Sequence, residues 1–209
     1  IVFSRKLGRW YMTCMGSSNL MVGDDETDEI IDVIKLPQPW PHGIAINDEI
    51  DRILVTSTVQ SDLKAAGEHI TVIKASTNEV LSFHKVSLKD SPSGAAPVEV
   101  AFVPHSDPAV AYITNMFEGS LWKATWRADR QEFEFEPFDD LAARGQGVPL
   151  EVYFSGDATR AYVSAAKPGH LNVYDVTDPA SPKHLMAVPA AAGAHHMAFS
   201  QDGRLVFVQ

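Results

Sequence analysis

The chain has 209 residues, of which 45% are hydrophobic and 21% are charged, and this composition is that of a globular protein rather than a disordered one. Its net charge of −10 and the lack of a basic stripe argue against a nucleic-acid-binding protein and against docking on anionic lipid. No run of about 18 apolar residues occurs, so no membrane-spanning helix is predicted. Because Cys14 is the single cysteine, a disulfide within the chain is excluded.

A repeated pattern of apolar strand, polar turn and second apolar strand runs through the chain. Residues 152–164 (VYFSGDATRAYVS) align with residues 44–56 without a gap, and with residues 197–209 after one deletion in the turn. Further copies begin at Phe3 and Val100. Two more apolar strands follow each complete hairpin, so the repeat is a four-stranded unit of roughly 50 residues.

In chain order, the predicted repeats cover residues 1–37, 38–88, 89–143, 144–190 and the partial unit 191–209. Four-stranded repeats of this length are typical of the blades of a β-propeller. We therefore predict an all-β fold, a single incomplete propeller domain over residues 1–209 with four full blades and part of a fifth. Helical repeats would need long stripes with a 3.6-residue period, and residues 141–145 offer at most one turn. A β-sandwich would not repeat in this register.

Two segments of the fourth repeat carry a family resemblance. The sequence SGDATRAYVS (155–164), followed by VYDV (173–176), resembles the YVTN-type bacterial propellers of the surface-layer and YncE-like group. The segment DVTDPASP (175–182) resembles blades of selenium-binding and LVIVD-type proteins. These resemblances imply seven blades, which need roughly 350 residues, so the remainder of the propeller is expected from residues outside this sequence. They also imply a periplasmic or extracellular location.

The candidate site follows from the alignment of the repeats. The innermost strands of a propeller all start on one face, so the residues that precede them form a ring at the mouth of the central channel. The corresponding residues at these starts are Gly43, Glu99, Glu151 and His196. The residues directly before them are, in the same order, His42, Val98, Leu150 and His195. Imidazole and carboxylate groups together suit zinc, copper, iron or manganese. The predicted metal ligands are therefore His42, Glu99, Glu151, His195 and His196.

The ring has two other interpretations, namely solvated polar groups of a water-filled channel and a small-ligand site. Adjacent residues of a strand point to opposite faces, so one of His195 and His196 is expected to face the channel and the other to pack between blades. The two histidine-containing pairs are similar to the copper-binding histidines of nitrous oxide reductase and of the methanethiol oxidases of the selenium-binding group. The cofactor this implies is a transition metal such as copper, iron or zinc.

The sequence contains no nucleophile elbow, no phosphate-binding glycine motif and no haem-attachment motif, so no catalytic residue is assigned. The first functional interpretation is therefore a binding or scaffold propeller of the bacterial envelope, which engages a protein partner or a small molecule at the propeller face. The alternatives are a copper- or iron-dependent oxidoreductase with its His/Glu site at the channel mouth, and a lactonase or hydrolase that uses a divalent cation as Lewis acid.

Overall fold

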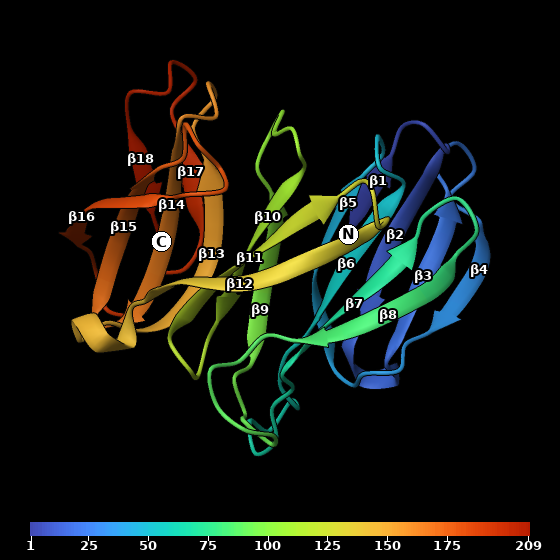
Figure 1. The fold of residues 1–209 in the computed structure, drawn as a ribbon, viewed down its shortest axis with the longest axis horizontal. Helices are drawn as coiled ribbons and strands as arrows, with labels where there is room; N and C mark the ends of the chain where they lie inside the picture. Colours follow the sequence, from blue (N-terminus) through green and yellow to red (C-terminus); the bar gives the residue numbers. More distant parts are fainter. The chain divides into compact units, whose positions relative to one another are not determined.

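The computed structural model describes residues 1–209 and consists almost entirely of antiparallel β-sheet (Figure 1). Four four-stranded sheets follow one another along the chain, and a two-stranded sheet comes last. This arrangement confirms the predicted all-β fold with four complete blades and part of a fifth. No helix of the structure has the length and apolar character needed to cross a bilayer.

The first two sheets have the strand orders β1-β2-β3-β4 and β5-β6-β7-β8. The strands of the first sheet are β1 (Val2–Ser4), β2 (Arg9–Cys14), β3 (Asn19–Asp24) and β4 (Ile30–Lys35). Those of the second are β5 (Pro41–Asn47), β6 (Arg52–Ser57), β7 (His69–Lys74) and β8 (Glu79–Lys85). Each strand pairs with the next one along the chain, as the repeated hairpins predict.

The remaining sheets continue the same up-and-down order. The third sheet contains β9 (Pro97–Phe102), β10 (Val110–Asn115), β11 (Ser120–Arg127) and β12 (Glu132–Asp140). The fourth contains β13 (Gly147–Phe154), β14 (Arg160–Lys167), β15 (Gly169–Asp175) and β16 (Lys183–Pro189), and the last pair is β17 (Met197–Phe199) and β18 (Val206–Val208). Two short 3₁₀ turns, η1 (Met15–Ser17) and η2 (Ala142–Arg144), complete the structure, the second lying where at most one turn was expected.

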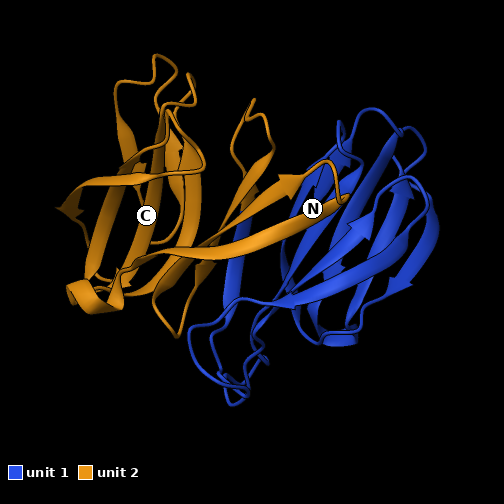
Figure 2. Cartoon of the chain, viewed as in Figure 1, with its two compact units in different colours: residues 1–100 blue, residues 101–209 orange.

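The chain divides into two compact units, residues 1–100 and residues 101–209, coloured separately in Figure 2. Each unit has its own apolar core, built between neighbouring sheets. In the first unit Tyr11, Leu20 and Ile53 are fully buried in this core. In the second unit Leu141 and Tyr174 are among the most deeply buried core residues. The second strands carry much of this burial, since every residue of β6 and β10 is buried.

Tyrosines at a corresponding position of the repeat link neighbouring blades. The Tyr11 hydroxyl of β2 donates a hydrogen bond to the carbonyl of Ala75 at 2.9 Å, in the second blade. The Tyr112 hydroxyl of β10 donates to the carbonyl of Pro179 at 2.9 Å, in the fourth blade. Burial raises the pKa of both phenols above its ordinary value, so both remain neutral donors at physiological pH. These bonds connect adjacent blades and support their packing.

Candidate functional site

The inner strand β13 carries a bulge at the point where the predicted site residue Glu151 stands. Pro149 pairs with Ala165 and Val152 pairs with Val163, so Leu150 and Glu151 together lie opposite one residue of β14. Two residues facing one is the geometry of a β-bulge, which bends a strand and redirects its side chains. Proline suits this position because it cannot donate a ladder hydrogen bond. The sequence thus redirects the Glu151 side chain away from regular alternation.

The Glu151 carboxylate makes two close contacts with imidazole nitrogens. Its Oε1 atom lies 3.1 Å from Nε2 of His195 and 3.5 Å from Nδ1 of His196. The Glu151 side chain is only 12% exposed, while those of His195 and His196 are 40% and 57% exposed. One ligand atom from each residue lies within 4.8 Å of the others, a spacing that could hold one metal ion. The carboxylate of the cluster is therefore largely shielded from solvent, while the two histidine side chains are accessible to it.

Both histidines approach the same carboxylate oxygen, whereas regular alternation along a strand would turn adjacent side chains to opposite faces. Their rings are stacked, with centroids 4.1 Å apart and planes at 15°. The physical reason is a second irregular pairing: the His195 amide donates to the carbonyl of Gln209 at 2.7 Å, and the Gln209 amide donates to the carbonyl of His196 at 2.9 Å. Two residues therefore share one partner before regular alternation begins at Met197.

The other two predicted ligands lie in the first unit. His42 is exposed, and its Nδ1 atom lies 3.2 Å from the carbonyl oxygen of Val98. Glu99 is half-buried in β9. The structure thus brings Glu151, His195 and His196 together within the second unit, while the place of His42 and Glu99 in the same site stays a prediction.

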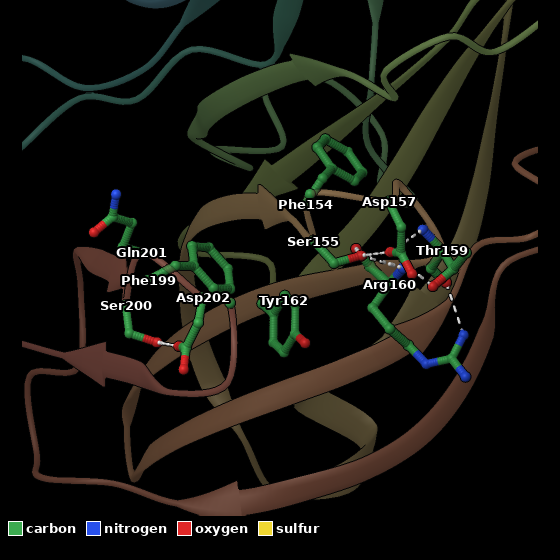
Figure 3. Close-up of a pocket in the computed structure, with 12 residues that line it drawn as sticks. Phe154, Ser155, Asp157, Thr159, Arg160, Tyr162, Phe199, Ser200, Gln201 and Asp202 are labelled. Carbon is green, nitrogen blue, oxygen red and sulfur yellow. Dashed lines mark hydrogen bonds between the residues drawn. The ribbon is translucent and has the colours of Figure 1, made fainter.

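A cavity lies at the other end of β13, where the sequence predicted no site (Figure 3). This cavity of about 630 Å³ is lined by the β13–β14 and β17–β18 turns, and the rings of Tyr162 and Phe199 meet within it edge to face at 5.3 Å. The signal in the sequence is the repeated Ser-x-Asp of the two turns, Ser155-Gly156-Asp157 and Ser200-Gln201-Asp202.

The carboxylates of this cavity are already engaged by their own turns. Hydrogen bonds from Ser155 and Thr159 lower the pKa of Asp157 to about 2, and the Ser200 hydroxyl donates to Asp202 at 2.6 Å. The Arg160 guanidinium pairs with Asp175 at 3.4 Å. Because these groups have their hydrogen bonds within the chain, they favour a structural role in the turns, and the Glu151 cluster is the stronger candidate site.

Comparison with known proteins assigns the fold but no family. No family model matches the chain, and no curated protein matches it. Among solved structures, the Cps50 (Swd1) β-propeller domain of Myceliophteria thermophila is 10% identical with a TM-score of 0.68, over 99% of this chain and 60% of that one. The fold is a β-propeller. A hypothetical selenium-binding protein of Sulfolobus tokodaii is 11% identical with a TM-score of 0.73, over 96% of this chain and 55% of that one.

A third similar structure is a functionally unknown protein of Desulfotomaculum acetoxidans, 14% identical with a TM-score of 0.54, over 97% of this chain and 72% of that one. This propeller chain therefore spans little more than half of the first two structures. At such low identity the likeness extends to the fold alone, and the function has to be argued from the site.

Proposed function

We propose that this chain forms blades of a propeller-fold binding protein whose ligand site lies where β13 and β17 begin, and that Glu151, His195 and His196 bind a divalent transition metal there. The observation that supports the proposal is the convergence of one carboxylate and two imidazoles, with ligand atoms within 4.8 Å of one another. Two of these residues are adjacent in sequence, and the third comes from the preceding blade.

The chemistry of the donor atoms selects the class of metal. Calcium and magnesium prefer shells made only of oxygen atoms, whereas imidazole nitrogen favours zinc, copper, iron or nickel. The Glu151 carboxylate adds a negative charge beside two imidazoles, which bind a metal in their neutral form, and this charge attracts a cation. The set therefore favours a transition metal over a hard cation.

Titration of Zn²⁺ and Cu²⁺ into the metal-free chain, followed by calorimetry, tests the proposal. We expect one ion per chain. Loss of a group that hydrogen-bonds a metal ligand costs about 10–100-fold in metal affinity, so replacement of the ligand carboxylate itself in Glu151→Gln should cost more than about 100-fold. Glu79→Gln is the matched control, because Glu79 is an exposed glutamate on the outer strand β8. Equal affinity of Glu151→Gln and wild type would refute the site.

A second candidate function is metal-dependent oxidation or reduction at the same site. The mixed nitrogen and oxygen donors favour this alternative over a lactonase or hydrolase that depends on calcium or magnesium. One structural neighbour is described as a hypothetical selenium-binding protein, and that description concerns the neighbour alone. Binding of Cu²⁺ with reversible reduction, followed by optical spectroscopy, supports the redox alternative, and binding of Zn²⁺ alone contradicts it.

Three further predictions belong to this proposal. His42 and Glu99 are proposed members of the same ring of ligands, which the substitutions His42→Ala and Glu99→Gln test in the same titration. A protein partner or small molecule is expected at the propeller face. Membership of the YVTN-type group, with a periplasmic or extracellular location, is proposed from the resemblance of the repeats alone.

A further inference from the structure

A serine or threonine hydroxyl recurs at one position of the repeat, the fifth residue of the second strand in each complete blade, and it is buried in the second, third and fourth blades. Its members are Thr13, Thr56, Thr114 and Ser164, on β2, β6, β10 and β14. Each of the three threonines donates a hydrogen bond to a carbonyl at the start of the next inner strand. These bonds are Thr13 to His42 (2.8 Å), Thr56 to Val98 (3.1 Å) and Thr114 to Leu150 (2.7 Å). In the first three blades the hydroxyl therefore connects the second strand to the inner strand of the next blade.

The same hydroxyl position also acts within its own blade. The Glu151 amide donates to the Ser164 hydroxyl at 3.1 Å, and the Gly43 amide donates to the Thr56 hydroxyl at 2.7 Å. In the fourth blade the peptide between Leu150 and Glu151 is consequently held on both sides, with Thr114 on its carbonyl oxygen and Ser164 on its amide nitrogen. Thr114 is 1% exposed and Ser164 is fully buried, so water does not replace either bond.

We infer that Ser164 and Thr114 are positioning residues for Glu151, which they hold in the orientation that lets its carboxylate meet both histidines. The inference rests on the proposed metal site. Glu151 stands in a bulge, where the ladder hydrogen bonds that normally orient a strand residue are disrupted. The two hydroxyls replace that lost constraint. Metal–ligand distances tolerate only about 0.2 Å of error, so a peptide free to tilt would weaken binding without loss of any ligand.

The test compares Ser164→Ala, Ser164→Thr and Ser4→Ala in the metal-free chain titrated with Zn²⁺ and Cu²⁺. Ser164→Ala should bind Zn²⁺ about 10-fold more weakly, with an altered Cu²⁺ electron paramagnetic resonance spectrum. Ser164→Thr should restore both, because threonine occupies this position in the other blades. Ser4 is the matched control, a fully buried serine that donates to Asp48 at 2.6 Å and accepts from the Leu7 amide at 3.1 Å. Ser4→Ala should lose stability but keep the affinity and the spectrum.

The second member of the pair guards against misfolding of the first variant. Thr114→Val keeps the shape of the side chain but removes the donor to Leu150, and it should reproduce the loss of affinity. Wild-type affinity and spectrum in both Ser164→Ala and Thr114→Val would overturn the inference while leaving the metal site intact.

Failure of the proposed function has a different result, namely a wild-type chain that binds neither ion. In that case the ring resonances of His195 and His196 in the metal-free chain still report the contact with Glu151. The inference predicts that these resonances shift in Ser164→Ala and not in Ser4→Ala. Unshifted resonances in Ser164→Ala would overturn it.

Discussion

The first halves of β5 and β13 have a similar backbone arrangement but carry different side chains. Both have a proline directly before a bulge, Pro41 in β5 and Pro149 in β13, and in both the bulged amide donates to a buried hydroxyl. The residue that makes this bond is Gly43 in β5 and Glu151 in β13. A Cβ atom on Gly43 would lie 2.3 Å from the carbonyl oxygen of Val98, so the close approach of the neighbouring strand leaves no room for a side chain.

The neighbouring segment of the same chain therefore determines whether a side chain fits at the start of each inner strand. At β5, the carbonyl of Val98 stands beside Gly43 and also contacts the ring of His42 at 3.2 Å. At β13, the corresponding space admits the Glu151 carboxylate, which His195 and His196 approach. The same bulge therefore occurs in both blades. The spacing to the neighbouring strand makes it a close packing contact in the second blade and part of a cluster of metal-binding groups in the fourth.

Substitution of Gly43 by alanine should have the largest effect on stability. Because the obstructing atom is backbone, the neighbouring strand has to move, and overpacking of this kind costs up to about 3 kcal/mol. Urea unfolding measures the change. Gly156 is the control, since nothing lies within 4 Å of a Cβ built there and Gly156→Ala should stay within about 0.5 kcal/mol of wild type. A Gly43→Ala variant as stable as Gly156→Ala would contradict the close approach.

Removal of the hydroxyl in β6 should have a smaller effect. Thr56→Ala leaves the buried amide of Gly43 without the acceptor that lies 2.7 Å away, which costs about 1–2 kcal/mol. Thr56→Ser keeps the hydroxyl and should recover most of the loss in the same urea measurement. Equal stabilities of the alanine and serine variants would show that the hydroxyl contributes nothing, and would remove the parallel with Ser164.

The smallest predicted effect is a difference in pH dependence between the β5–β6 turn and the β13–β14 turn. Asn47 caps the β5–β6 turn, with its Oδ1 accepting from the amides of Glu49 and Ile50 at 3.0 and 3.3 Å, and it does not titrate. Asp157 caps the β13–β14 turn, and the hydrogen bonds from Ser155 and Thr159 lower its pKa from 3.8 to about 2.

Because this pKa is depressed in the folded chain, the stabilisation is fully present above about pH 4 and is lost as the pH falls through about 2. The amide resonance of Thr159, which donates to Asp157 at 3.1 Å, should therefore shift between pH 4 and pH 2. In Asp157→Asn the shift should disappear, which makes the turn behave like the one capped by Asn47. A Thr159 shift that persists in Asp157→Asn would assign the titration to another group.

Much of this comparison was accessible from the sequence. The apolar hairpins predict the blades, and the alignment of the repeats places Glu151 and His196 at corresponding positions. Alternation of side chains then fails at the bulges, because Leu150 and Glu151 share one partner and His195 and His196 share another. A pairing irregularity of this kind depends on the neighbouring strand, which sequence periodicity does not describe.

The hydroxyl position escaped sequence reasoning for a similar reason. Threonine and serine near strand ends are common, and their β-branched or small side chains suit a strand without any special contact. Only the three-dimensional structure shows that Thr114 and Ser164 meet on opposite sides of one peptide. The cavity beside Tyr162 also depends on how two turns from different blades approach each other.

Elemental analysis of the protein purified without added metal tests directly whether Glu151, His195 and His196 bind a metal ion. We expect a near-stoichiometric amount of zinc, copper or iron in the wild-type protein. His196→Ala should fold almost unchanged, because its side chain is 57% exposed, and should lose that metal. Metal at background level in the wild-type protein, or equal metal content in wild type and His196→Ala, would contradict the proposed metal site.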